Sequence, residues 1–398
     1  MHCVTMISRL LVLASFTSAL AVAQTDQGSG DTTQDFQLPG YDMPVVDGVG
    51  ALDDASFTGN PLESIAGRWP ADLVVAPIPG YSPQLGWNMK LAGGYFLGSA
   101  DKDPGTKLSM VGGFVMGAEN GSYAYGGGAS FHLLEDKLRV KLGAAYADIR
   151  YRFYGIGNLN NESGIALDIL QKGPLYFTSG SWRVWKNLYL GLGYLRGNVD
   201  SRVRFASDTG RFDPSLNLDI GAYMFPIEID SRDHQQFPRS GWLVKARSAF
   251  YRESAGSDFD AQTFKFSANR YLPMREQDVL ALRLVASIAS DSAPFFLLST
   301  VGGSTDLRGY PSGRYRDLAM YALQSEYRWW FNDRWIFTGF AGFGEVAESF
   351  SGIGENFLPA AGVGARFVLS KKHRVSLSAD LAVGDDGAEF YFGVGEAF

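Results

Sequence analysis

From residue 69 to Phe398, the sequence alternates between apolar and polar side chains with a period of two. In the stretch RVSLSADLAVG (residues 374–384), five apolar residues share one face and the polar and charged residues share the other. The same alternation recurs in LRVKLGAA (138–145), FKFSAN (264–269) and LALRLVAS (280–287). Strict alternation is the pattern of a β-strand with one buried face, whereas an amphipathic helix repeats about every 3.6 residues. The sequence therefore predicts an all-β protein.

The polar faces of these strands indicate where their apolar faces lie. A soluble β-sandwich also alternates, but it hides its apolar face inside. Here the polar faces are rich in lysine, arginine and glycine, and aromatic residues gather near strand ends, as at Trp329, Trp330, Trp335 and Tyr391. These features are typical of a membrane barrel with an apolar outer band, aromatic girdles and a polar lumen. A closed barrel satisfies every backbone group inside the membrane, so we predict a transmembrane antiparallel β-barrel.

The spacing of turns predicts the number of strands. Counting back from a last strand at 388–398 gives fifteen strands, and the stretch ADLVVAPI (71–78) supplies a sixteenth that gives the even number of such barrels. Short connections such as FNDR are assigned to the periplasmic side. Long ones, such as residues 196–215, are assigned to the exterior.

The first 68 residues differ from the barrel sequence. Residues 1–23 contain Arg9, an apolar run and an A-x-A end at Ala23, which is the pattern of a cleaved secretory signal peptide. Residues 24–68 are acidic, with no lysine or arginine between Gln24 and Gly67, and they show no periodicity. That composition predicts a flexible linker, since it cannot bury a core. Residues 69–398 form the predicted barrel domain.

Charge and rare residues exclude several classes of function. The formal net charge of −7 argues against a nucleic-acid partner. After signal cleavage the chain would hold three histidines, His132, His234 and His373, and we expect no partnered serine and carboxylate beside any of them. The same shortage of ligands predicts no metal site, and no pattern predicts a cofactor. We therefore expect no enzymatic activity.

Several motifs, in order along residues 70–398, resemble the BamA/TamA-type surface-antigen family of outer-membrane assembly and translocation barrels. The most specific is GGSTDLRGYPSGRYRD (302–317) followed by ALQSEYRWW (322–330), which is similar to that family's lid-loop sequence. The stretch DSRDHQQFPRSG (230–241) resembles its turn of the form D-x-R-D then P-x-x-G, and FYGIGN (153–158) and the terminal Phe398 also fit. The resemblance implies a sixteen-stranded barrel in the outer membrane of a Gram-negative bacterium.

The resemblance also implies roles for particular residues. The loop between strands eleven and twelve should fold into the lumen through Leu307, Arg308, Gly309 and Tyr310. Alternation on the next strand turns Glu326 inward, so we expect a bidentate pair between Arg308 and Glu326. The family's second carboxylate is replaced by Gly342 in FAGFG (340–344), which leaves Glu326 as the one predicted acceptor.

Two further sets of residues follow from the resemblance. Turn residues should fix a periplasmic turn: Asp230, Arg232, Asp233, Pro238 and Gly241. Three aromatic residues of the last strand resemble the signal that the host's barrel-assembly machinery reads: Phe390, Phe392 and Phe398. Glu396 interrupts their apolar face.

The family's periplasmic client-binding repeats, the POTRA domains, have no counterpart in residues 24–68, which resembles the short, barrel-only branch. The sequence thus predicts a barrel embedded in outer-membrane lipid that aids membrane biogenesis or translocation, with a separate periplasmic partner or as a homo-oligomer. The alternative is a passive pore or surface antigen that keeps the fold without translocation.

Overall fold

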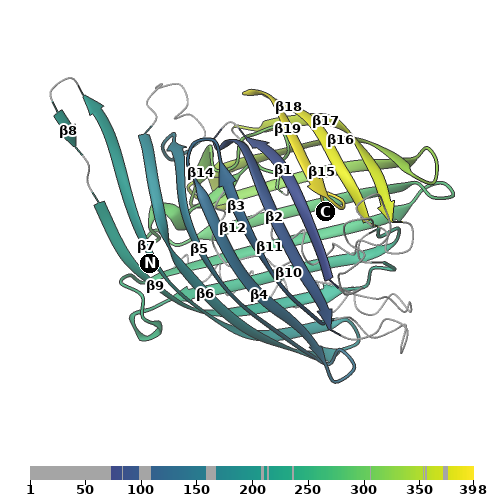
Figure 1. Cartoon of the computed structure of the whole chain (residues 1–398), viewed down its shortest axis with the longest axis horizontal. Coiled ribbons are helices and arrows are strands. Elements are labelled where there is room, and N and C mark those ends of the chain that lie inside the picture. Colours follow the sequence, from purple (N-terminus) through teal and green to yellow (C-terminus); the bar gives the residue numbers. More distant parts are fainter. Residues whose placement is uncertain are drawn as a thin grey trace.

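The computed structural model describes residues 73–82, 84–97, 109–157, 167–207, 210–212, 215–234, 237–304, 306–352, 354, 356–370 and 375–398. The predicted signal peptide and linker lie outside these residues. Sixteen antiparallel strands form a nearly closed barrel, which agrees with the predicted fold and strand number (Figure 1). No helix in the described part of the chain is long and apolar enough to span a membrane.

The barrel strands run in chain order. They are β1 (Leu73–Ser82), β2 (Gly86–Leu97), β3 (Ser109–Ala118), β4 (Tyr123–Leu133), β5 (Leu138–Phe153), β6 (Leu167–Trp185), β7 (Leu188–Ser207), β9 (Ser215–Asp230), β10 (Gly241–Tyr251), β11 (Ala261–Pro273), β12 (Val279–Ala289), β15 (Ala319–Trp330), β16 (Trp335–Ala347), β17 (Leu358–Ser370), β18 (Val375–Gly384) and β19 (Gly387–Val394). Three short strands complete the set: β8 (Gly210–Phe212), β13 (Ser299–Val301) and β14 (Tyr315–Asp317).

Each barrel strand pairs antiparallel with the next, from β1 to β19. The first and last strands, β1 and β19, lie side by side, with Cα atoms within 8 Å of each other. No register of paired residues joins these two strands where the structure describes them. Following the predicted orientation, we call the end that carries the β12–β15 connection the exterior end and the other the periplasmic end.

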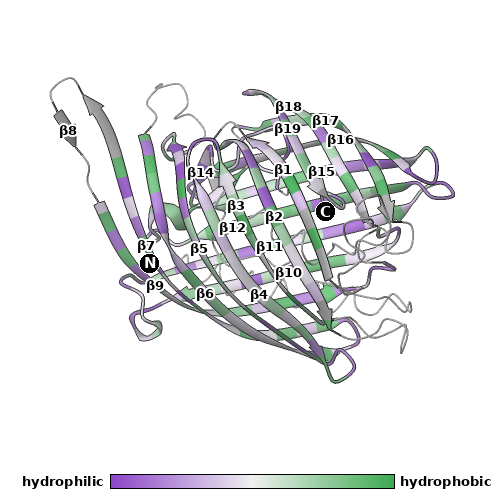
Figure 2. Ribbon diagram, in the orientation of Figure 1, coloured by the Kyte–Doolittle hydropathy of each residue, from purple (hydrophilic) through white to green (hydrophobic). Residues whose placement is uncertain are grey.

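Alternate residues of each strand face opposite sides of the wall, so apolar and polar residues are interleaved along the strands (Figure 2). The outward residues include large apolar side chains in the middle of the strands, such as Val115, Leu192 and Val363. Near the periplasmic end, Trp329 and Trp335 are exposed and lie against Phe337. This outer band and its aromatic border are what a lipid-facing barrel wall requires. Tyr391, in contrast, contacts residues of the β12–β15 connection inside the lumen.

The predicted exterior loop at 196–215 is wrong, because β7 continues to Ser207 and β9 begins at Ser215. The two strands project beyond their neighbours, with β8 beyond them (Figure 1). Beyond Tyr194, toward the exterior end, the chemical character of the two faces of β7 is exchanged. Val199 faces inward and is buried, while Asp200 and Arg202 face outward and form an ion pair. The outer face of β7 becomes polar where the strand extends beyond the apolar band. A prediction that looks for outward apolar residues therefore misses this part of the strand.

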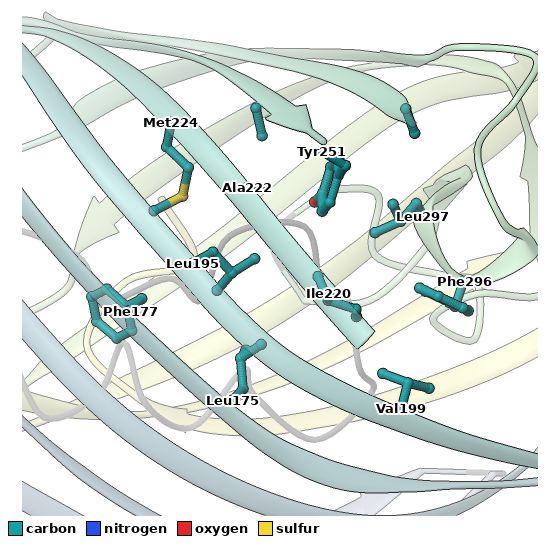
Figure 3. Close-up of a cluster of buried hydrophobic side chains, with 12 residues drawn as sticks. Leu175, Phe177, Leu195, Val199, Ile220, Ala222, Met224, Tyr251, Phe296 and Leu297 are labelled. Carbon is teal, nitrogen blue, oxygen red and sulfur yellow. The ribbon is translucent and has the colours of Figure 1, made fainter. Parts of the chain in front are cut away.

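The lumen is also less polar than predicted. Its exterior half is lined by buried apolar residues, and one cluster joins β6, β7, β9, β10 and β11 to the short 3-10 helix η4 (Phe295–Leu297). Figure 3 shows Phe296 and Leu297 of η4 across from Leu195, Val199 and Ile220 of the wall. The segment after β12 therefore packs into the barrel as a core would, and charged side chains collect nearer the periplasmic end.

A buried polar cluster closes the turn between β4 and β5. Leu134, Glu135 and Asp136 all have φ between 55° and 60°, a region that non-glycine residues seldom occupy. The Asp136 carboxylate accepts hydrogen bonds from Arg139 Nη2 and from the Tyr189 hydroxyl, both at 2.7 Å. Arg139 also donates to Glu228 on β9 at 2.8 Å. These contacts hold a strained turn in place.

This cluster contains one of the three histidines. His132 has a carboxylate partner, because its Nδ1 lies 2.8 Å from Asp136 Oδ1. That carboxylate is shared with Arg139 and Tyr189, so it anchors the turn. His234 accepts a hydrogen bond from the Phe237 backbone, and His373 lies outside the described residues.

We predict that Asp136→Ala lowers the free energy of unfolding by about 3–5 kcal/mol, because Arg139 would keep its buried charge with one partner fewer. Urea unfolding of the refolded barrel, followed by heat-modifiable mobility, measures the change. The matched control is Glu135→Ala, in the same strained turn but with an exposed side chain, where the change should stay within about 0.5 kcal/mol. Equal losses in the two variants would contradict the role given to the carboxylate.

Candidate functional site

The connection between β12 and β15, residues 290–318, folds back into the lumen, and we call it the lid. It joins the eleventh and twelfth barrel strands and contains η4 and the β13–β14 hairpin. Val301, Leu307 and Tyr310 of the lid are fully buried against apolar residues of β15, β16 and β17. The exterior half of the lumen is thus filled by this chain's own side chains.

Arg308 carries the lid's contact with charged side chains of the barrel wall. Its Nη1 is 2.7 Å from Glu326 Oε2 on β15 and 2.8 Å from Asp380 Oδ2 on β18, and all three side chains are buried. Its guanidinium carbon sits 3.5 Å from the centre of the Phe340 ring, close enough for a cation–π contact. The Nε group donates to Gln324 at 3.3 Å. Arg308 therefore points inward and is held on several sides.

The contact with Glu326 differs from the expected bidentate fork. One nitrogen, Nη1, approaches both carboxylates, and the approach to Glu326 is an ion pair by distance without hydrogen-bond geometry. The other Glu326 oxygen, Oε1, accepts a hydrogen bond from Arg328 Nε at 2.7 Å. Glu326 contacts both Arg308 and Arg328, so it does not form an exclusive pair with Arg308.

The expectation of a single acceptor is wrong, because Asp380 supplies the second one from β18. Gly342 has a separate reason to be glycine. A Cβ at this position would lie 2.7 Å from the Gln324 side chain and 2.3 Å from the Leu323 carbonyl. Gln324 uses that space, and its Nε2 donates to the Asp306 carbonyl of the lid at 2.7 Å. The neutral amide of Gln324 thus binds the lid in the space beside position 342, where the family has a carboxylate.

Three arginines and three carboxylates form one buried network around Arg308. Arg366 on β17 donates to Asp380 and lies 3.6 Å from Glu326 Oε2. Glu396, just after β19, lies 3.3 Å from both Arg328 and Arg366. The formal charges of these six side chains cancel, which is the condition for burying them together.

The two residues after Arg308 fix the lid against the wall. Gly309 has φ +117°, and a Cβ there would approach Ala360 to 3.0 Å and Val383 to 3.2 Å, so glycine fits both the conformation and the space. Its N–H donates to the Tyr391 hydroxyl at 3.0 Å. The Tyr310 hydroxyl donates to the Pro359 carbonyl at 2.6 Å. Burial raises the pKa of Tyr310, which keeps this donor protonated.

The upper part of the lid is tied to several strands. Arg314 pairs with Asp386 in the β18–β19 turn at 2.7 Å. Gln84, in the β1–β2 turn, donates to the Ser312 carbonyl at 2.6 Å. Gly157, after β5, forms a bridge with Arg316. The lid is therefore fastened to both sides of the seam between β1 and β19.

The predicted turn residues lie together between β9 and β10. Arg232 donates to both carboxylate oxygens of Asp230 at 3.0 Å, and Asp233 accepts from the backbone of Arg239 and Ser240. Gly241 has φ +100°, and a Cβ there would lie 2.1 Å from the Ser231 carbonyl. Pro238 is buried beside Phe237. All five predicted residues belong to one turn.

The three aromatic residues of the predicted assembly signal do not share a face. Phe390 and Phe392 are exposed on the outer face of β19. The predicted strand at 388–398 is too long, since β19 ends at Val394, and Phe398 packs inside the barrel against Tyr271, Val279 and Ala281. Glu396 does not interrupt the apolar face, because it also turns inward.

Sequence reasoning missed Phe340, Gln324, Arg328, Arg366 and Asp380 as parts of the site. The signal for Asp380, Arg366 and Arg328 was present, since each is a charged residue on the inward face of an alternating strand. Alternation gives the face but not the depth, so it could not show that these three strands meet at Arg308. Among the residues with described positions, no group of histidine, cysteine or acidic residues is arranged to hold a metal ion.

Comparison with known proteins agrees with this architecture. Residues 173–398 match the Omp85 superfamily domain, more than half of the chain. The chain belongs to the Omp85 superfamily. It is accordingly an outer-membrane barrel of a Gram-negative bacterium, and it is not an enzyme. No curated protein sequence matches the chain significantly.

Similar folds occur among solved structures. BamA from Haemophilus ducreyi lacking POTRA domains 1–3 has 14% identity and a TM-score of 0.55, over 81% of this chain and 69% of that one. CdiB from Acinetobacter baumannii has 11% identity and a TM-score of 0.52, over 81% and 59% of the two chains. CdiB from Escherichia coli has 12% identity and a TM-score of 0.55, over 82% and 62%. At such identities the likeness concerns the fold.

We predict that Arg308→Ala and Glu326→Ala each open the lid to added protease while the barrel stays heat-modifiable. Removing one member of a buried charged group costs about 3–5 kcal/mol, because its partners lose compensation, whereas the strand ladders are untouched. Arg308→Lys should restore protection in part, since lysine keeps the charge but lacks the planar group that lies over Phe340. Limited trypsin digestion of intact cells or micelles, with cleavage sites read by mass spectrometry, measures lid exposure.

The control is Glu253→Ala, an acidic residue of the exposed loop after β10, which should leave lid cleavage at the parental rate. Arg308→Glu combined with Glu326→Arg should recover part of the protection if the contact is direct. Parental resistance in both single alanine variants would show that this pair does not hold the lid.

Proposed function

We propose that this barrel aids the insertion or translocation of proteins at the outer membrane, together with a periplasmic partner or a second copy. Membership of the Omp85 superfamily and the fold likeness to BamA and CdiB support this role. The chain covers only 59% to 69% of the length of the three similar structures, so a partner would supply functions that their remaining segments provide.

The observation that carries the proposal is the filled lumen. A barrel of about sixteen strands is wide enough for a water-filled channel. Here the lid occupies the exterior half with buried apolar side chains, and the Arg308 network fastens it from below. A passive pore has no use for such a core. A barrel that opens only during translocation or insertion does, because it must stay sealed between events.

The first test is conductance. Single channels of the intact protein in planar bilayers should be small or flickering, and deletion of residues 304–314 should enlarge them. The enlarged pore should prefer anions, because four basic residues stand on the inward faces of β10, β11 and β12: Lys245, Arg247, Lys265 and Arg283. Reversal potentials in a salt gradient measure this preference.

Deletion of residues 253–257 is the matched control, since that loop contacts the outer faces of β7 and β9 through Tyr194 and Tyr223. It should leave conductance unchanged. A large and steady conductance in the intact protein would instead favour the passive pore.

A second test asks for the activity itself. Liposomes containing the purified barrel should speed the folding of an added, urea-denatured outer-membrane barrel relative to empty liposomes, as judged by heat-modifiable mobility over time. Liposomes carrying an unrelated closed porin at the same density control for bilayer defects. Folding at the same rate in all three preparations, with or without periplasmic extract, would contradict the proposed function.

A further inference from the structure

A row of tyrosines marks the exterior border of the lipid-facing band on one side of the barrel. The row crosses the outer faces of five strands that follow one another in the wall: Tyr125 of β4, Tyr146 of β5, Tyr176 of β6, Tyr194 of β7 and Tyr223 of β9. The ring centres of Tyr125 and Tyr146 lie 5.6 Å apart, and those of Tyr194 and Tyr223 lie 5.9 Å apart. Tyrosine collects where acyl chains meet polar headgroups, so this row gives the level of the membrane surface.

Beyond the tyrosines, the outer faces of β5, β6 and β7 become charged, while their inward residues stay apolar and buried: Ile149, Ile169 and Val199. Arg150 on β5 and Lys172 on β6 each lie four residues beyond the tyrosine of their own strand. Four residues span about 13 Å along a strand, which a tilt of about 40° reduces to a height of about 10 Å. The headgroup layer of an ordinary bilayer is only about 5–7 Å thick on each side. Both cations therefore stand above the phosphates of ordinary phospholipids.

Three cations surround Leu170 on this outer face. The strand register places Leu170 between Arg150 of β5 and Arg202 of β7, and Lys172 is the next outward residue of β6. Neighbouring strands lie about 4.8 Å apart, so the Cα atoms of the two arginines are roughly 10 Å apart, with Lys172 about 7–8 Å from each. Such a spacing fits one sugar ring over the leucine, with an anionic group of that sugar between two of the cations.

The turn between β3 and β4 positions Arg150. Its Nη1 donates to the Asn120 carbonyl at 3.2 Å, and its backbone N–H donates to the Ser122 hydroxyl at 2.9 Å. A Cβ at Gly121 would lie 2.8 Å from Nη1, so glycine leaves the space that the guanidinium uses. Among the side chains that the structure describes, no carboxylate forms an ion pair with Arg150. The guanidinium is thus held in place with its charge unbalanced and most of its five N–H groups available.

The other two cations share one carboxylate. Lys172 Nζ lies 3.6 Å and Arg202 Nη2 lies 3.2 Å from Asp200 Oδ2. The Lys172 and Arg202 side chains are 33% and 44% exposed, so both reach the surface. Asp148 stands opposite Lys172 on β5. With Arg150, the outward group holds three cations and two carboxylates, and its formal charge is positive by one.

We propose that this face of β5, β6 and β7 binds a phosphorylated glycolipid of the exterior leaflet. Its phosphate lies between Arg150 and Lys172, and its sugar ring lies over Leu170. The exterior leaflet of a Gram-negative outer membrane consists largely of such lipids, in which sugars raise the phosphates above the acyl chains. The planar guanidinium of Arg150 matches two phosphate oxygens, and the Asp200 carboxylate accepts hydrogen bonds from sugar hydroxyls. The proposal does not depend on the translocation role.

The test uses the full barrel refolded in detergent micelles, with native mass spectrometry to measure bound lipid. The probe is purified diphosphorylated lipid A that keeps its innermost core sugars. The comparison lipids are the same glycolipid without its phosphates and phosphatidylglycerol. The intact barrel should bind the diphosphorylated glycolipid most tightly. Arg150→Gln and Lys172→Gln should each weaken that binding about tenfold, the effect of losing one hydrogen bond to a charged group. The double variant should bind it no better than phosphatidylglycerol.

The matched control is Lys186→Gln, which removes one positive charge from the exposed turn between β6 and β7 at the periplasmic end. It should leave the affinity for the glycolipid unchanged. Arg150→Lys should keep part of the affinity, since lysine retains the charge but lacks the planar fork. Heat-modifiable mobility shows that each variant is folded, and Lys172→Gln decides the question if Arg150→Gln does not refold.

Three results would overturn the proposal. The first is equal affinity of the intact barrel for all three lipids. The second is a loss of affinity in Lys186→Gln as large as in Lys172→Gln, which would show attraction by overall charge. The third is displacement of the glycolipid by millimolar inorganic phosphate, which would show a site for free anions instead of a lipid.

Discussion

The arrangement of the lumen depends on one buried arginine. Arg308 gives up its hydration inside the barrel, and that cost is offset only because Glu326 and Asp380 lie within ion-pair distance of its Nη1 while Phe340 covers its face. The contacts come from β15, β16 and β18, so the arginine requires three strands at correct depth. The lid, in turn, requires the arginine, because the strand pairing of its described residues consists of the short β13–β14 hairpin and a single bridge to Gly157.

Two kinds of stabilisation are therefore separated in this molecule. The wall is stabilised by strand ladders that run from β1 to β19 and do not involve the lid. The contents of the lumen are stabilised by apolar packing in the exterior half and by the neutral network of six charged side chains nearer the periplasmic end. This separation allows the contents of the lumen to rearrange while the wall persists. Glu326 is shared among three arginines, Arg308, Arg328 and Arg366.

Much of the wall could be predicted from alternation alone, because inward and outward residues differ in chemistry wherever the outer face meets lipid. The prediction failed where the apolar residues change to the inward face. Val199 is inward and Asp200 outward beyond the apolar band, so the part of β7 after residue 196 was predicted to be a loop. Arg308 and Glu326 could be named because a motif marks the first and alternation orients the second. Asp380 could not be assigned, since its depth beside Arg308 depends on the register across β15 to β18. The inward turn at Gly395 was missed because Phe398 continues the aromatic pattern of β19 in sequence while the backbone leaves the sheet.

The inward fold of the lid can be measured directly by chemical access from outside. In a variant with Cys3 replaced by serine, a single cysteine at Leu307, beside Arg308, should stay unreactive to a membrane-impermeant maleimide in intact barrels, because this position is fully buried. A single cysteine at Ser349, in the exterior connection after β16, provides the fully labelled reference. The account predicts labelling at 307 only after Arg308→Ala is added or the barrel is unfolded. Labelling at 307 as fast as at 349 in the otherwise native protein would contradict it.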